Sequence, residues 1–329
     1  MSETFSALRV HRTAGVNHPE LEQLRVDDLT PGDVLIRVEY STINYKDALA
    51  VTGAAPIIRA YPRVGGIDLA GEVVESDDER FKPGHKVVSL VGGLGESRDG
   101  GYAEFARVNG DALEVLPEAI DTRRAMALGT AGFTAALAVH RLEHNGQRPG
   151  LGPMVVTGAT GGVGAVAIDL FSGRGYEVAA LTGKTQHGDF LRSIGAHSII
   201  DRNALELDSK PLGRAQWGGA VDNLGGEVLT WLTRTVRPTG NIASVGLAVN
   251  TELRTTVMPF ILRAVSLIGI NMEFHAGLRA QLWRRLADDL APRHLDTITT
   301  REVTLEELPG CFEAYLEGRV SGRTLVRLG

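Results

Sequence analysis

The sequence contains almost no cysteine. Cys311 is the only one among 329 residues, which excludes an internal disulfide framework and any cysteine-rich zinc site. We expect Cys311 to be a small buried apolar residue. Stability must then come from hydrophobic cores, for which 43% of hydrophobic residues is ample material.

Long apolar runs and long basic runs are also missing. Residues 126–139 come nearest to a membrane span, but they fall short of the roughly 18 apolar residues that a span requires. The N-terminus lacks the charged-then-apolar order of a signal peptide. A net charge of −6 without a basic cluster gives no electrostatic support for binding nucleic acid or a membrane surface. We therefore expect a cytoplasmic protein that binds small molecules.

The residues that are present change in pattern along the chain. The first third holds short strand-like runs separated by turn residues, which predict a β-barrel or sandwich, at 33–41, 66–76, 84–90 and 100–108. A helical pattern starts near Asp121 and ends at Gly146. From Met154 onward, about six short apolar runs alternate with helical stretches. This alternation predicts an α/β domain with a parallel, doubly wound sheet.

The segment from Gly158 to Gly164, GATGGVG, lies between the first of these strands and a helix. The dinucleotide fingerprint G-x-G-x-x-G requires this context, because its glycines let backbone N–H groups approach a pyrophosphate at a helix N-terminus. Ala159 takes the place of the first glycine. We predict that this glycine turn, residues 158–164, binds a dinucleotide.

The end of the second strand indicates which dinucleotide is bound. NAD sites usually carry a carboxylate there for the ribose 2′-hydroxyl, but this strand ends in Thr182-Gly183-Lys184. A hydroxyl and an ammonium attract a 2′-phosphate, whereas a carboxylate repels it. Arg202, after the third run, could supply a second cation. The sequence therefore predicts NADP(H) as the cofactor.

Several motifs resemble those of the medium-chain dehydrogenase/reductase superfamily: GIDLAGEVV, GHKVVSL, GGYAEF and TAGFTA. The segments STINYKDALAVTG, TGATGGVG and TTVMPFILR are similar to its acryloyl-CoA reductase and quinone oxidoreductase branch. This resemblance covers nearly the whole chain. It implies a β-rich GroES-like catalytic domain at 1–123, a Rossmann NADP-binding domain at 124–263, and a segment at 264–329 that holds the last Rossmann strand and returns to the catalytic domain.

The same resemblance bears on metal binding. Zinc-dependent members of the superfamily carry a cysteine and a His-Glu pair at the catalytic metal, where this chain has Asn44-Tyr45 and Ile67-Asp68. The nine histidines show no ligand spacing. We therefore expect no metal site and a mechanism without a Lewis acid.

The family's cofactor contacts fall on defined positions of this chain. They comprise Tyr45, Thr160, Gly161, Gly162, Val163, Thr182, Gly183, Lys184, Arg202, Leu247, Ile261, Asn271, Met272 and Arg323. The resemblance implies that Leu247 and Ile261 lie near the nicotinamide and that Arg323 reaches the cofactor from the other domain. The alternatives are core packing for Leu247 and Ile261 and a surface position for Arg323.

Without a metal, a nicotinamide can deliver hydride to Cβ of an α,β-unsaturated thioester while negative charge develops on the thioester oxygen. The best polar cluster for this catalysis is Asn44-Tyr45-Lys46-Asp47, in which Asn44, Tyr45 and Asp47 are the candidate catalytic residues. Asn44 could donate to the oxygen, and Tyr45 could orient the nicotinamide or act as an acid, with solvent as another proton source. Alternatively, Lys46 and Asp47 form only a surface pair. Coenzyme A would also need a basic rim, for which Arg59, Arg63 and Arg98 are candidates.

These observations favour an NADPH-dependent reductase of a short enoyl-CoA, by resemblance one that converts acryloyl-CoA to propionyl-CoA. An NADPH:quinone oxidoreductase and a non-catalytic NADPH-binding protein are the alternatives. The apolar run at 264–271 suits the edge of the Rossmann sheet. An uncovered edge invites aggregation, and superfamily members without the zinc lobe usually pair through it. We therefore expect a homodimer.

Overall fold

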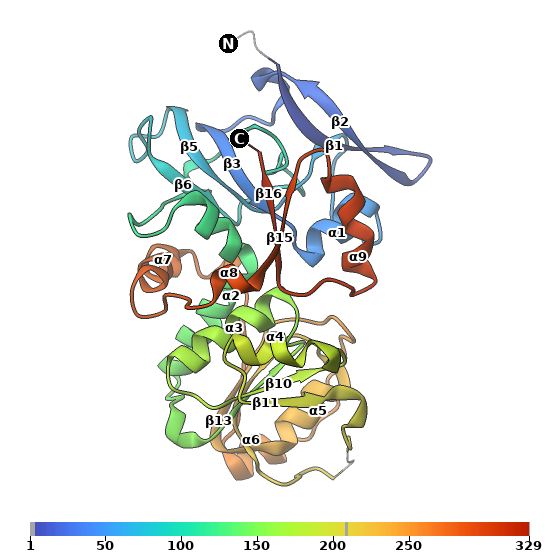
Figure 1. Cartoon of the computed structure of the whole chain (residues 1–329), viewed down its shortest axis with the longest axis vertical. Helices are drawn as coiled ribbons and strands as arrows, with labels where there is room; N and C mark the ends of the chain where they lie inside the picture. Colours follow the sequence, from blue (N-terminus) through green and yellow to red (C-terminus); the bar gives the residue numbers. More distant parts are fainter. Residues whose placement is uncertain (1–3, 208–209, 329) are drawn as a thin grey trace. The chain divides into compact units, whose positions relative to one another are not determined.

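The computed structural model describes residues 4–207 and 210–328, which fall into two compact units (Figure 1). Unit 1 contains the described residues up to Thr130, Arg279–Ala287 and the described residues from Thr299 onward. Unit 2 contains Ala131–Leu278 and Asp288–Ile298. The chain thus passes between units inside helix α2 (Thr122–His144), which is kinked at Gly129 (φ 51°, ψ −160°). After residue 278 the chain alternates between the units.

Unit 1 is rich in β-structure. In its described part, β1 (Phe5–Thr13) pairs with β2 (Val16–Leu24) and β4 (Arg63–Val64). A larger sheet has the order β15 (Thr299–Thr304), β16 (Arg323–Arg327), β3 (Val34–Thr42), β5 (Leu69–Ser76), β6 (Lys86–Ser89) and β8 (Glu114–Val115), and β7 (Phe105–Val108) also pairs with β3. The helices of the unit are α1 (Tyr45–Thr52), α7 (Arg279–Ala287) and α9 (Phe312–Leu316). These sheets confirm the expected β-rich GroES-like domain.

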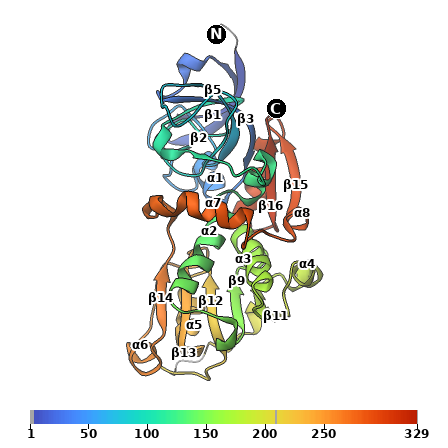
Figure 2. The same ribbon diagram turned by 90° about the vertical axis from the view of Figure 1, so that its left-hand side faces the viewer.

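Unit 2 is built on a parallel sheet. Its order, among the described residues, is β11 (Ser198–Asp201), β10 (Val178–Thr182), β9 (Met154–Thr157), β12 (Trp217–Asp222), β13 (Val236–Ser244) and β14 (Ser266–Gly269). The helices are α3 (Gly162–Gly173), α4 (Gly188–Ser193), α5 (Gly226–Thr235), α6 (Met258–Arg263) and α8 (Leu295–Ile298). Figure 2 shows β14 at one edge of this sheet. This strand order confirms the predicted doubly wound Rossmann topology. From β9 the successive strands are added on one side of the sheet up to β11 and then on the other side from β12, and such sheets bind ligands at this switch point.

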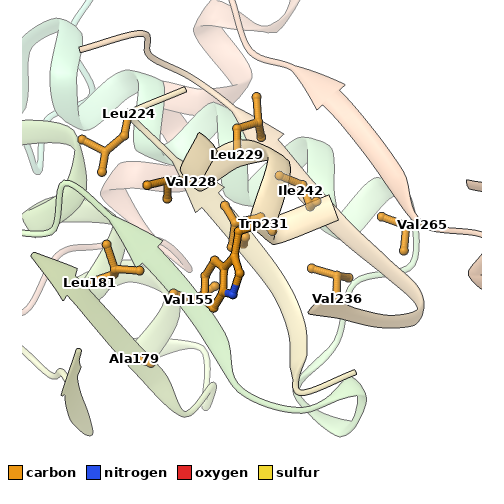
Figure 3. Packing of buried hydrophobic residues seen from close by; sticks show 12 residues of the cluster. Val155, Ala179, Leu181, Leu224, Val228, Leu229, Trp231, Val236, Ile242 and Val265 are labelled. Atoms are coloured by element: carbon orange, nitrogen blue, oxygen red, sulfur yellow. The ribbon is translucent and has the colours of Figure 1, made fainter. Parts of the chain in front are cut away.

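A buried apolar cluster holds α5 against the sheet (Figure 3). Trp231 and Leu232 of α5 pack over Val155 of β9 and Ile242 of β13. Removing a large apolar side chain of this kind from water contributes about 1.5–3 kcal/mol. In unit 1, Cys311 is buried, as expected. Within the described residues, helices with the length and apolarity needed to cross a membrane are absent.

Candidate functional site

The glycine turn joins β9 to α3 in unit 2. Its left-handed backbone falls on Gly158 (φ 59°), not on Ala159, which explains why alanine is tolerated at the first fingerprint position. Gly161 caps α3, and its N–H donates to the Gly158 carbonyl at 3.0 Å. A Cβ on Gly164 would lie 2.8 Å from the Ala159 Cα and closer still to the Gly158 carbonyl oxygen. The turn therefore packs against the helix only because residue 164 has no side chain, and the α3 N-terminus beside it favours an anion.

The buried carboxylate of Asp222 connects the ends of β9 and β12, the two strands between which the strand order reverses. Asp222 ends β12 and accepts hydrogen bonds from Thr157 Oγ1 at 2.7 Å and from Gly225 N at 2.8 Å. Asn223 Nδ2 donates to the Thr157 carbonyl at 2.7 Å. Burial raises the pKa of Asp222. Sequence reasoning missed this residue, although a lone aspartate ending the apolar run GAVDN was a usable signal.

The predicted 2′-phosphate residues lie together at the ends of β10 and β11. The buried Thr182 hydroxyl accepts a hydrogen bond from Lys184 N at 3.0 Å. A Cβ on Gly183 would lie 3.1 Å from Arg202 Nη2, so the guanidinium rests against the bare Gly183 backbone. Burial lowers the pKa of the Lys184 ammonium, a cost that a neighbouring anion would offset. The carboxylate of Asp201, at the end of β11, accepts a hydrogen bond from Asn203 N at 2.9 Å.

The remaining cofactor candidates of unit 2 occupy different environments. Leu247 and Ile261 are 66% and 74% exposed, so the core-packing alternative is wrong for both. Asn271 accepts a hydrogen bond from Glu273 N at 3.0 Å and caps a short helical turn. Met272 is buried. Contact of these four residues with a cofactor stays a prediction.

In unit 1, Asn44 is the centre of a buried polar network at the start of α1. Its Nδ2 donates to Asp47 Oδ2 at 3.1 Å and to Asp68 Oδ2 at 2.9 Å, and its Oδ1 accepts from Arg323 Nη1 at 3.1 Å. The two donations use both amide hydrogens, so the geometry favours a positioning role for Asn44 over donation to a substrate oxygen. Tyr45, the first residue of α1, is 48% exposed.

Asp47 belongs to this network and not to the surface. It is buried and accepts hydrogen bonds from Asn44 N at 2.8 Å and Ile67 N at 2.9 Å. The alternative of a Lys46–Asp47 surface pair is therefore wrong, and Lys46 pairs with Glu96 instead. Burial, followed by the charge of Asp68, raises the pKa of Asp47 to about 7.

Arg323 is 2% exposed, so the surface alternative is wrong for this residue as well. It donates to Thr42 Oγ1 at 2.8 Å and to the Ala127 carbonyl at 3.2 Å, in addition to Asn44. All these partners belong to unit 1. Arg323 is thus a buried cation of the polar network, and its contact with a cofactor stays a prediction.

Sequence reasoning treated Asp68 only as the residue at a zinc-ligand position, yet the structure buries it completely. Its carboxylate accepts from Thr130 N at 2.8 Å and from Thr130 Oγ1 at 2.5 Å. Burial raises its pKa, opposed by these bonds, by Asn44 and by the charge of Arg323. An acid inside the apolar run GIDLAGEVV was the signal that could have identified it.

Two further expectations change in unit 1. Of the proposed basic rim, Arg63 is buried against Asp99 at 3.2 Å and Arg98 donates to the Pro31 carbonyl, which leaves Arg59 on the surface. The histidines also come closer to ligand spacing than the sequence suggested. The β1–β2 pairing brings ligand atoms of His11, Glu20 and Glu22 within 4.8 Å of one another, although Glu22 already pairs with His11 and Arg9.

Comparison with known proteins agrees with this architecture. Residues 30–118 match the alcohol dehydrogenase GroES-like domain. The acrylyl-CoA reductase AcuI of Ruegeria pomeroyi is 45% identical over 98% of both chains. The crystal structure of the Salmonella enterica YhdH oxidoreductase in complex with NADP is 43% identical, with a TM-score of 0.95 over 98% of this chain and 100% of that chain.

A third relative is YhfP of Bacillus subtilis, 45% identical over 100% of both chains, whose name gives it provisionally as a quinone oxidoreductase. Its crystal structure with NAD bound has a TM-score of 0.96 over 99% of this chain and 100% of that chain. Identities of this size over whole chains show common family membership. The chain belongs to the medium-chain dehydrogenase/reductase superfamily, in the branch of AcuI and YhdH.

Proposed function

We propose that this protein is an NADPH-dependent reductase of short α,β-unsaturated acyl-CoA thioesters, with acryloyl-CoA as substrate and propionyl-CoA as product. The observation that carries the cofactor assignment is the pairing of a glycine turn with Thr182, Lys184 and Arg202 at the adjoining strand ends. The acyl-CoA assignment is supported by the name of the Ruegeria relative. The name of the Bacillus relative supports quinones as the second candidate acceptors.

The residues of unit 2 fit the cofactor. Gly158 provides the positive φ of the turn and Gly164 lets α3 pack closely against it, so the turn is suited to a pyrophosphate at the α3 N-terminus. Arg202 and Lys184 offer donors to a 2′-phosphate. When bound, NADPH supplies the hydride that adds to Cβ and leaves negative charge on the thioester oxygen. A proton must then reach Cα. The proposed chemistry uses no metal.

The candidate catalytic residues of unit 1 comprise one exposed side chain, Tyr45, and two buried ones, Asn44 and Asp47. Tyr45 projects from the first position of α1 and is the candidate to orient the nicotinamide or to supply the proton. Asn44 and Asp47 hold the backbone from which it projects. Precise support of this kind lowers a barrier by fixing reacting groups in place.

The acceptor assignment is tested by initial rates of NADPH oxidation with acryloyl-CoA, crotonyl-CoA and 1,4-benzoquinone, each corrected for the rate without enzyme. We expect kcat/KM for acryloyl-CoA to exceed that for benzoquinone by at least about tenfold, since a site built for one transition state discriminates by 1.4 kcal/mol or more. A faster reaction with benzoquinone would favour the quinone alternative. If the protein binds NADPH but reduces none of these acceptors, the alternative of a non-catalytic NADPH-binding protein would be favoured.

We also propose that the protein is a homodimer joined along β14. This strand is an edge of the parallel sheet, and α6, which directly precedes it in the chain and contacts β13, exposes Leu262 to 63%. An apolar surface next to an open edge is typical of an interface. Sedimentation should therefore give twice the chain mass. Leu262→Lys should shift it toward monomer, whereas Leu21→Lys, on the β1–β2 hairpin, should not; a monomer at every concentration would contradict the proposal.

A further inference from the structure

The network around Asp68 links the start of α1 with the kink inside α2. Through Asn44, Asp68 reaches the N-cap of α1, one residue before Tyr45. Through Thr130, it reaches the residue that follows the Gly129 kink of α2, where the backbone N–H bonds to the Asp68 carboxylate. Asp68 therefore satisfies a donor that the kink makes available.

The chain leaves room for this arrangement at Gly129. A Cβ there would lie 2.7 Å from Asp68 Oδ2 and 2.6 Å from Arg323 Nη2, distances that real Cβ atoms do not adopt. The positive φ of Gly129 also disfavours any other residue. The buried carboxylate is thus enclosed by donors on several sides, as a buried charge requires. Such enclosure holds each donor in one geometry.

We propose that Asp68 is a positioning residue that fixes Tyr45, acting through Asn44 at the start of α1 and held in place by Thr130. The inference rests on the proposed function in so far as Tyr45 acts on the nicotinamide or the acceptor. Asp68 is fully buried, so its proposed effect runs through the side chain of Asn44. It sets the direction of the Asn44 amide, and Asn44 sets the backbone from which the exposed tyrosine ring projects.

The test is a double-mutant cycle on kcat between Tyr45→Ala and Asp68→Asn, with Thr130→Val as a milder second probe of the same carboxylate. The acceptor is whichever of acryloyl-CoA, crotonyl-CoA and 1,4-benzoquinone the wild-type enzyme reduces fastest. We expect Asp68→Asn to lower kcat by about tenfold or more, with NADPH affinity, followed by fluorescence, changed by less than about twofold. Thr130→Ser keeps the hydroxyl donor and should restore most of the rate lost in Thr130→Val.

The coupling between the Asp68 and Tyr45 substitutions in this cycle tests the proposal. If Asp68 acts through Tyr45, the double variant is no slower than Tyr45→Ala alone, because the group being positioned is already gone. Rate losses that multiply, or a wild-type kcat in both Asp68→Asn and Thr130→Val, would overturn the proposal. If Asp68→Asn does not fold, the Thr130→Val cycle gives the same reading. Failure to reduce acyl-CoA would sink the proposed substrate, while the cycle could still be read with benzoquinone.

Discussion

Lys184→Ala removes one of two proposed phosphate contacts and should raise the Michaelis constant for NADPH by about tenfold or more, while that for NADH stays nearly unchanged. The 2′-phosphate carries close to two negative charges near neutral pH, and each charge-assisted hydrogen bond contributes about 1.5–3 kcal/mol. Two such bonds, from Lys184 and Arg202, would favour NADPH over NADH by at least about a hundredfold, since 1.4 kcal/mol is tenfold. Partial exposure and salt reduce the effect.

The measurement is kcat/KM with each cofactor at low and high ionic strength. Arg254→Ala is the matched control, because Arg254 is an exposed cation of the same unit that pairs with Glu252. The preference for NADPH should shrink as salt rises, which identifies its origin as electrostatic. The alternative is that NAD(H) is used as well, since the structure of the Bacillus relative contains NAD. Equal use of both cofactors, or a Lys184→Ala variant that weakens both alike, would place the phosphate site elsewhere.

Gly164→Ala should weaken NADPH binding and lower the thermal stability together. The added Cβ would meet backbone atoms of Gly158 and Ala159, which cannot move aside as a flexible side chain could. Overpacking of this kind costs about 1–3 kcal/mol. If the strain falls on the turn, the cost corresponds to a loss of roughly 5- to 150-fold in NADPH affinity.

NADPH titration and thermal melts provide the measurement. Gly150→Ala is the control, since a Cβ there meets open space and the backbone lies outside the left-handed region. It should change neither quantity. A Gly164→Ala variant with wild-type affinity and melting temperature would show that α3 can move away from the turn without consequence, and the close packing would then not be needed for binding.

The sequence alone predicts the features that depend on neighbours along the chain. The glycine turn, the strand before it and the helix after it lie within a few residues, and their pattern is readable because turn geometry and helix capping are local. The absence of an acid after β10 is equally local, and Arg202 does lie against Gly183 as that prediction requires. Hydrophobic periodicity was enough for the parallel sheet, because each strand shows its burial in its own residues.

The tertiary structure alone decided which polar residues are buried together. Asp68 meets Asn44 across 24 residues and Thr130 across 62, and Arg323 meets Asn44 across 279. No local pattern encodes such contacts, because a charged side chain is buried only where distant segments supply its partners. For the same reason, sequence left Asp47 and Arg323 open between surface and interior. Their place in one enclosed network follows from the return of β16 to β3, a pairing that only the folded chain creates.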